Sequence, residues 1–145
     1  MTFLPLQIGR NLVRTPAFDA WVTSCGFGDT AVFEAHMTLA YSKAPVDWER
    51  PVFAPRQNTV TCEDGERFFE ILDRGVLVLR FESNELSARW NELVQAGASW
   101  DYPDFKPHIT LSKSFSVVPP ELRSYQGLII LGPEYRKQAK ANAVG

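Results

Sequence analysis

The chain contains two histidines, and each one begins the same four-residue pattern, His-x-Thr-Leu. The first pattern starts at His36 and the second at His108. In a β-strand, residues two positions apart point to the same face of the sheet. Each histidine is therefore expected to project together with its threonine, Thr38 or Thr110, while the intervening residue and the leucine face the core. This feature predicts two strands that each present an imidazole and a hydroxyl.

The segments before the two motifs also resemble each other, because a predicted amphipathic helix and a loop precede the motif in each half. The first helix is predicted to follow Thr15 and Pro16 and to end at Gly26. The second is predicted to begin near Ser83 and to end at Gly97. The spacing from helix to motif is similar in the two halves. A repeat of this kind is typical of two structurally related lobes.

Short apolar stretches separated by turn residues predict the strands. They cover residues 33–41, 58–62, 67–72, 76–81, 108–112 and 125–131. The stretches 58–62 and 67–72 are expected to form a hairpin, because the residues between them include Gly65. Helices placed among hairpins favour an α+β fold with antiparallel sheet over a doubly wound parallel sheet.

The composition is typical of one globular domain, which we expect to span residues 1–145. A net charge of −2 gives no general field for long nucleic acid. The apolar runs are far shorter than the roughly 20 residues of a membrane-spanning helix, and we expect no signal peptide. Cys25 and Cys62 are isolated from other metal-ligating residues, so free thiols in a reducing cytoplasm are expected rather than a zinc site.

Two imidazoles and two hydroxyls in one site suit the cleavage of a phosphodiester bond. Imidazole transfers protons well near neutral pH. Opening a ribose 3'–5' phosphodiester requires a base for the 2'-hydroxyl and an acid for the departing 5'-oxygen, which His36 and His108 can supply without a metal. Thr38 and Thr110 can donate hydrogen bonds to the non-bridging oxygens. The sequence leaves open which histidine starts as the base. The competing interpretation is that both histidines are packed or surface residues, and the matched pair argues against it.

Longer stretches of the chain resemble one branch of the 2H phosphoesterase superfamily, the phage anti-CBASS cyclic-oligonucleotide phosphodiesterases. The similar stretches are residues 36–42, 44–48, 81–87, 96–100, 104–111, 125–127 and 131–134, which are spread along the chain from residue 36 to residue 134. The resemblance implies a bilobal fold in which two pseudo-symmetric antiparallel sheets flank a central cleft and the helices lie outside. It also implies an enzyme without cofactor or metal that hydrolyses cyclic di- and trinucleotide immune signals in the cytoplasm of an infected bacterium.

The resemblance also implies roles for single residues. His36 and His108 match the catalytic pair, and Thr38 and Thr110 match their phosphate-binding partners. Glu134 matches an acidic residue beside the ligand, and its alternative is a solvated surface carboxylate. The sequence departs from the branch at Gln7, which stands where an aromatic residue is expected to stack on a base. It departs again at residues 112–114, which lack an aromatic–acidic ending.

Three other functions compete with this hypothesis. A general 2H enzyme would act on 2',3'-cyclic phosphates or on linear RNA ends with the same four residues. A non-catalytic sponge would bind cyclic nucleotides and release them unchanged, although a binder has no need of paired proton-transfer groups. A phage structural accessory protein is the third alternative. The preferred ring size, the preferred bases and the oligomeric state are left open by the sequence.

Overall fold

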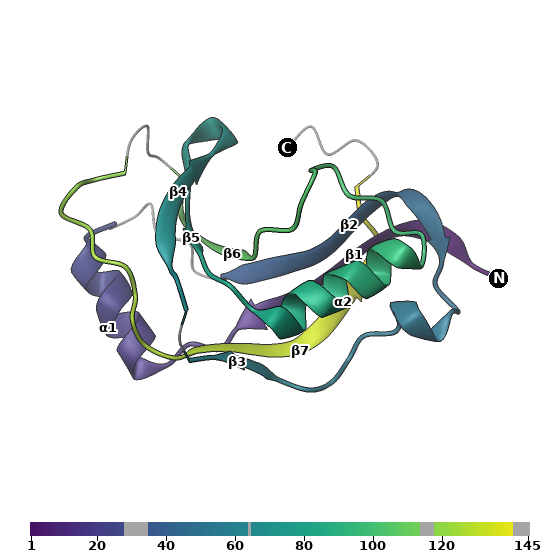
Figure 1. Cartoon of the computed structure of the whole chain (residues 1–145), viewed down its shortest axis with the longest axis horizontal. Helices are drawn as coiled ribbons and strands as arrows, with labels where there is room; N and C mark the ends of the chain where they lie inside the picture. The colour runs from purple at the N-terminus through teal and green to yellow at the C-terminus, as the bar shows by residue number, and fades with distance from the viewer. Residues whose placement is uncertain (28–34, 64, 114–117, 141–145) are drawn as a thin grey trace.

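The structure is a computed structural model of the whole chain, and it describes residues 1–27, 35–63, 65–113 and 118–140 (Figure 1). The helices are α1 (Pro16–Cys25) and α2 (Asn84–Gln95), with short 3-10 turns at Pro51–Phe53 and Asp73–Gly75. The strands are β1 (Phe3–Leu12), β2 (His36–Asp47), β3 (Val60–Cys62), β4 (Phe68–Leu72), β5 (Val76–Arg80), β6 (His108–Ser112) and β7 (Ile129–Lys137).

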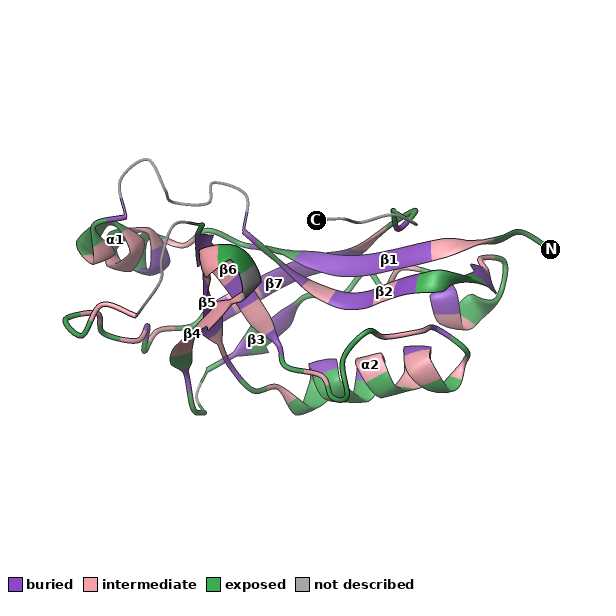
Figure 2. Ribbon diagram, turned by 90° about the horizontal axis from the view of Figure 1, so that it is seen from above, coloured by how far each residue is buried: buried purple, intermediate pink, exposed green. Residues whose placement is uncertain are grey.

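These strands form two antiparallel sheets, so the predicted α+β fold is confirmed. One sheet has the strand order β2-β1-β7-β3 and the other has the order β4-β5-β6. Helix α2 lies along one face of the four-stranded sheet, and α1 lies towards the other end of the molecule (Figures 1 and 2). On α1, Trp21 stacks on Phe69 of β4 with 6.1 Å between ring centroids. Helix α2 therefore covers the four-stranded sheet, whereas α1 contacts the three-stranded sheet through Trp21.

Both helices begin and end as their capping residues predict. The Thr15 hydroxyl accepts a hydrogen bond of 3.1 Å from the backbone N–H of Phe18, and Ser83 caps α2 in the same way. Gly26 follows α1 with φ of 72°, a left-handed conformation that glycine adopts at low cost. Gly97 has φ of 115° just after α2. The helix boundaries are therefore set by local chemistry.

Strand β1 was missing from the strands predicted by pattern. It lies in the interior of its sheet between β2 and β7, and residues 6 to 10 are all buried (Figure 2). A strand buried on both faces does not alternate between apolar and polar residues. Gln7, Gly9 and Arg10 interrupt the apolar run as well, so neither of the two usual strand patterns is present.

The predicted hairpin of residues 58–62 and 67–72 is wrong. Strand β3 pairs with β7 and strand β4 pairs with β5, so the two stretches belong to different sheets. The chain crosses from one sheet to the other at Arg67, whose buried guanidinium donates to the carbonyl oxygens of Cys62 and Tyr125 at 2.8 and 3.0 Å. A glycine-containing turn is compatible with a hairpin, but these long-range partners decide the pairing.

Strand β7 begins and ends later than the predicted strand 125–131 and contains a β-bulge. Leu131 pairs with Leu12 of β1, and the next pair is Glu134 with Arg10. Two residues of β7, Gly132 and Pro133, therefore lie opposite a single residue of β1. Proline is tolerated at a bulge because no ladder hydrogen bond is required from it. The extra residue shifts the alternation of side chains along the rest of β7 by one position.

Strands β5 and β6 lie within one residue of their predicted bounds, whereas β2 continues past Tyr41 to Asp47. Residues 33 and 34 of the predicted strand lie outside the described residues. Both cysteines are free thiols, and burial raises the pKa of Cys25 and Cys62. Among the residues that the structure describes, no helix combines the length and the apolar character that spanning a membrane requires.

Candidate active site

The two motifs alternate between buried and accessible residues. Met37 and Ile109, the second residues of the motifs, are 1% and 0% exposed, and the leucines that end the motifs are buried as well. His36 is exposed, while Thr38, His108 and Thr110 are half-buried. Each strand is thus anchored by apolar side chains on one face and presents its imidazole and hydroxyl on the other.

The strands that carry the motifs approach each other although they belong to different sheets. Strand β2 is an outer strand of the four-stranded sheet, and β6 is an outer strand of the three-stranded sheet. Cα atoms of β2 and β6 lie within 8 Å of one another, at the end of β2 where His36 begins the strand (Figure 1). The fold therefore brings together two segments that are far apart in the sequence.

The His108 ring is oriented by the backbone. Its Nδ1 lies 2.8 Å from the carbonyl oxygen of Lys106. A carbonyl oxygen only accepts hydrogen bonds, so Nδ1 carries a proton and donates a hydrogen bond to the carbonyl oxygen of Lys106. In the neutral ring the lone pair then lies on Nε2. This nitrogen is the atom of His108 that is available for proton transfer.

His36 borders a surface hollow, which we call the His36 hollow, lined by Asn11, His36, Tyr135 and Lys137. Asn11 lies opposite His36 in the ladder between β1 and β2. The Tyr135 ring meets the His36 ring edge to face, with 6.4 Å between centroids and 72° between planes. The Lys137 ammonium lies 5.7 Å from the centroid of the Tyr135 ring. Tyr135 and Lys137 were not among the predicted site residues, because the predicted strand ends at Leu131.

Gln7 lies on the same face of the four-stranded sheet as Tyr135 and Lys137, but it is only 9% exposed. Its side-chain amide hydrogen-bonds the Tyr135 hydroxyl. Burial raises the pKa of Tyr135, and the hydrogen bond with Gln7 acts in the opposite direction. The amide thus contacts a side chain that lines the His36 hollow, and a contact between Gln7 and a ligand stays a prediction.

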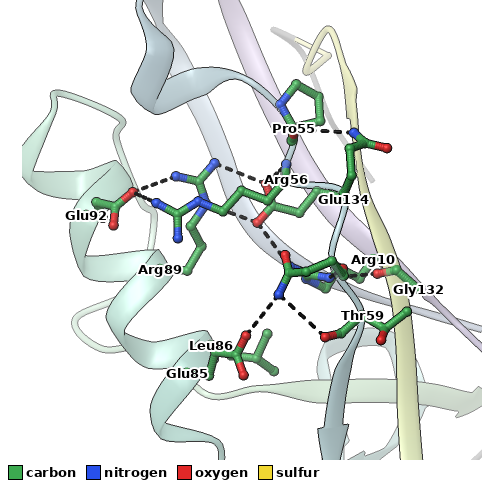
Figure 3. Close-up of polar contacts among 12 residues, drawn as sticks. Arg10, Pro55, Arg56, Thr59, Glu85, Leu86, Arg89, Glu92, Gly132 and Glu134 are labelled. Atoms are coloured by element: carbon green, nitrogen blue, oxygen red, sulfur yellow. Dashed lines mark hydrogen bonds and ion pairs between the residues drawn. The ribbon is translucent and has the colours of Figure 1, made fainter.

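Glu134 lies in an ion-pair network between α2 and the four-stranded sheet (Figure 3). Arg89 of α2 donates from Nε and Nη2 to the two carboxylate oxygens, both at 3.0 Å. The backbone N–H of Arg56 donates to Oε1 at 3.1 Å, and an Arg10 nitrogen lies 3.6 Å from Oε2. Burial lowers the pKa of Arg10, while the charge of Glu134 raises it.

This placement differs from both sequence interpretations of Glu134. The side chain is 0% exposed, so the alternative of a solvated surface carboxylate is wrong. The bulge in β7 places Glu134 on the side of α2 and its neighbour Tyr135 on the side of His36. Its carboxylate oxygens are occupied by Arg89 and by the backbone. A contact between Glu134 and a ligand stays a prediction that this arrangement does not support.

Residue types that bind metals do not gather in the described part of the chain. Over residues 1–27, 35–63, 65–113 and 118–140, no three His, Cys, Asp or Glu side chains form a group that could hold a metal ion. What the site offers instead is a pair of imidazoles and a pair of hydroxyls on two facing strands. This set of groups can transfer protons and donate hydrogen bonds to an anion.

Solved structures with a similar fold include one described as a phosphoesterase, with a TM-score of 0.51 and 18% identity, covering 96% of this chain and 99% of that chain. The apo form of Escherichia coli LigT matches with a TM-score of 0.53 and 16% identity, covering 96% of this chain and 92% of that chain. LigT in complex with 3'-AMP matches with a TM-score of 0.52 and 19% identity, covering 96% and 97% of the two chains. At these identities the likeness concerns the fold, and it confirms the predicted 2H phosphoesterase fold.

Curated relatives carry the name anti-CBASS protein Acb1. The relative from Sphingomonas paeninsulae is 36% identical over 138 residues, which cover 90% of this chain and 22% of that protein. The relative from Caulobacter sp. strain RHG1 is 34% identical, with the same two shares. The relative from Salmonella phage S16 is 32% identical over 109 residues, covering 74% of this chain and 68% of the phage protein.

The chain thus spans about a fifth of the length of the two bacterial relatives and two thirds of the phage relative. The family model described as anti-CBASS protein Acb1 matches residues 14–144, a range that includes both His-x-Thr-Leu motifs. With the fold, the paired motifs and these similarities in agreement, the chain belongs to the anti-CBASS Acb1 family.

Proposed function

We propose that this chain is a metal-independent phosphodiesterase that uses His36 and His108 to open a 3'–5' bond in a small cyclic nucleotide. The observation that supports the proposal is the approach of β2 and β6, because these are the two strands that carry the His-x-Thr pairs. Membership of the anti-CBASS Acb1 family supports it. A nucleotide, 3'-AMP, is bound in one of the solved structures of similar fold, which supports the ligand class.

The proposed reaction has two steps. One imidazole accepts the proton of the ribose 2'-hydroxyl while that oxygen attacks phosphorus, and the other, protonated, imidazole donates its proton to the leaving 5'-oxygen. The product is a linear nucleotide with a 2',3'-cyclic phosphate. Water then opens this phosphate with the roles of His36 and His108 reversed. Nε2 is the nitrogen that His108 uses in both steps, since Nδ1 is held by Lys106.

The threonines act on the phosphate itself. Thr38 and Thr110 stand two residues after their histidines, on the same face of each strand. Their hydroxyls donate hydrogen bonds to the non-bridging oxygens, where negative charge increases in the transition state. Both side chains are half-buried, so they are accessible to a ligand while their strands are anchored by buried neighbours.

The proposed substrates are cyclic di- and trinucleotides that serve as bacterial immune signals. The curated relatives are named anti-CBASS proteins, and two of those matched come from phages of Salmonella and Escherichia. We place the action of this chain in the cytoplasm of an infected bacterium, where cleavage removes the signal before its effector responds. The small His36 hollow and the net charge of −2 suit a small ligand better than long nucleic acid.

The test is to incubate the purified protein with 3'3'-cyclic GMP–AMP and with cyclic tri-AMP in EDTA, and to separate the products by HPLC. Linear products are expected with the unmodified protein and not with the His36→Ala/His108→Ala double variant. Both histidines are accessible, so the double variant should keep its fold, which circular dichroism checks. Turnover in a parallel assay without EDTA, but not in the assay with EDTA, would contradict the metal-free mechanism.

Intact rings would contradict the proposed substrate. Cleavage of 2',3'-cyclic AMP in a parallel assay would then identify a general 2H enzyme. Recovery of unchanged cyclic nucleotide from the denatured protein would identify a sponge. Loss of the fold in the double variant would favour the interpretation that the histidines are structural.

A further inference from the structure

Tyr135 lies on β7, yet its side chain crosses β1 towards the first motif. The crossing point is Gly9, which pairs with Tyr135 on one side and with Thr38 on the other. A Cβ atom at Gly9 would lie 2.5 Å from the Tyr135 hydroxyl oxygen, 2.7 Å from Cζ and 2.7 Å from the carbonyl oxygen of Met37. No side chain fits at such distances, so the position of the Tyr135 ring requires glycine at residue 9.

A second contact lies at the far end of the ring. Burial raises the pKa of the Tyr135 hydroxyl, and the side-chain amide of Gln7, which is 9% exposed and two residues before Gly9 on β1, lowers it as a hydrogen-bonding group. The phenol thus lies over Gly9, with the Gln7 amide beside its hydroxyl.

The ring held in this way is the neighbour of the His36 imidazole. The two rings meet edge to face, 6.4 Å apart, an arrangement that aromatic pairs favour. The two histidines differ here. The His108 ring is oriented by a hydrogen bond to Lys106, whereas in the described part of the chain the ring contact seen for His36 is the one with Tyr135. Packing against Tyr135 thus orients the His36 ring, as the hydrogen bond to the backbone orients the His108 ring.

We propose that Tyr135 is a positioning residue that orients the His36 imidazole for proton transfer, and that Gly9 and Gln7 serve to seat it. The inference rests on the proposed function, because that function assigns a proton transfer to His36. A misplacement of about 1 Å in a reacting group can cost about 100-fold in rate, so the orientation of an exposed imidazole matters.

The kinetic test compares substitutions at the two crossing positions, with cyclic dinucleotide as the substrate. Tyr135→Leu removes the ring and is expected to lower kcat by about 10- to 100-fold while KM changes by less than about threefold. Tyr135→Phe keeps the ring edge against His36 and is expected to recover most of that loss. A fall confined to KM, or equal losses in the Leu and Phe variants, would overturn the inference.

Gly9→Ala tests whether the space above residue 9 holds the Tyr135 ring in place, and it leaves the tyrosine itself unchanged. The added methyl group must displace the ring, so kcat is expected to fall as it does in Tyr135→Leu. In the Tyr135→Leu background the same substitution should cost clearly less, because the clash with the ring is then absent and the clash with the carbonyl oxygen of Met37 remains. Full additivity of the two losses would overturn the inference.

A spectroscopic measurement decides the question without turnover. The chain has only two histidines, so long-range ¹H–¹⁵N NMR spectra of the imidazoles contain one set of signals from His36 and one from His108. Tyr135→Leu is expected to shift the His36 set and to leave the His108 set in place. An unchanged His36 set would overturn the positioning role. If the unmodified protein cleaves no cyclic nucleotide, the proposed function fails, and this measurement still tests the contact.

Discussion

Thr38 and Thr110 are half-buried and stand two residues after their histidines, and each hydroxyl can donate one hydrogen bond to a bound phosphate. Replacing either residue with valine keeps the shape and removes the donor. We expect kcat to fall by about 10- to 100-fold in each single variant, since losing one preorganised donor to a developing charge commonly costs about that much or more. Steady-state kinetics with a cyclic dinucleotide measures the effect.

Thr61 offers the matched control for these variants. It is an exposed threonine in β3, the strand at the other side of the four-stranded sheet from β2. Thr61→Val should leave kcat within about twofold, because surface substitutions away from the site usually change little. If Thr38→Val and Thr110→Val behave like Thr61→Val, the threonines have no part in the reaction.

Two roles are suggested for Glu134. The resemblance implies a contact with the ligand, and the structure shows a buried ion pair. The structure surrounds it with Arg89 and Arg10, whose side chains are 4% and 3% exposed. Glu134→Gln removes the buried counter-charge of both cations, and Glu92, whose side chain is 41% exposed, then remains as the ion-pair partner of Arg89 at 2.8 Å. We expect the free energy of unfolding to fall by about 3–5 kcal/mol, the usual cost of breaking a buried ion pair. Urea unfolding followed by circular dichroism measures it.

The surface pair of Lys43 and Asp101 provides the comparison, at 3.0 Å with both side chains 46% exposed. Lys43→Met should leave the urea midpoint of unfolding almost unchanged, because an exposed ion pair contributes little to stability. A Glu134→Gln variant that is as stable as Lys43→Met but binds nucleotide poorly would instead support the ligand contact implied by the resemblance.

At the scale of single elements, the bulge at Gly132 and Pro133 decides which face of β7 each later residue joins. Deleting Pro133 leaves Gly132 alone opposite Asn11, so Glu134 stays opposite Arg10 and Tyr135 stays opposite Gly9 in a strand without a bulge. We expect the deletion to fold, because Glu134 stays on the side of Arg89. Pro133→Ser keeps the number of residues and should also fold and turn over normally. Thermal melting and the HPLC assay follow both variants, and an unfolded deletion would contradict this account of the bulge.

The elements that local chemistry specifies were predictable from the sequence. Capping residues such as Thr15 and Ser83 gave the helix boundaries, and the alternation around Ile109 gave β6. Pairing between distant strands was not predictable in the same way. The turn around Gly65 suits a hairpin, but the buried side chain of Arg67 bonds carbonyl groups from distant segments, and no local pattern reveals that.

In the candidate site, too, the residues set by a local pattern were predictable and those set by strand pairing were not. His36, Thr38, His108 and Thr110 follow from a local repeat, and their strands do approach each other. Tyr135 was not predicted, because the bulge decides on which face of the sheet it lies, and no local sequence pattern indicates that bulge. Its contact with Gln7 depends in turn on β1, a strand without a recognisable pattern.

At the scale of the whole molecule, the proposed ligand would bridge two sheets. A ligand that binds only the folded protein, present at 100 times its Kd, stabilises it by about 2.7 kcal/mol. For a chain of this size that corresponds to a rise in Tm of about 5–10 °C. The His36→Ala variant, which is expected not to turn over, is suited to the measurement. Differential scanning fluorimetry with 3'3'-cyclic GMP–AMP should show the rise, and an unchanged Tm at saturating nucleotide would contradict binding.

The approach of β2 and β6 has a further consequence, for the solubility of the chain. An outer strand exposes a row of unpaired backbone N–H and C=O groups, which can pair with a strand of another molecule and start aggregation. Here the outer strands that carry the two motifs lie close to each other, so each restricts the access of a foreign strand to its partner. The arrangement that assembles the histidines therefore also protects the edges that present them.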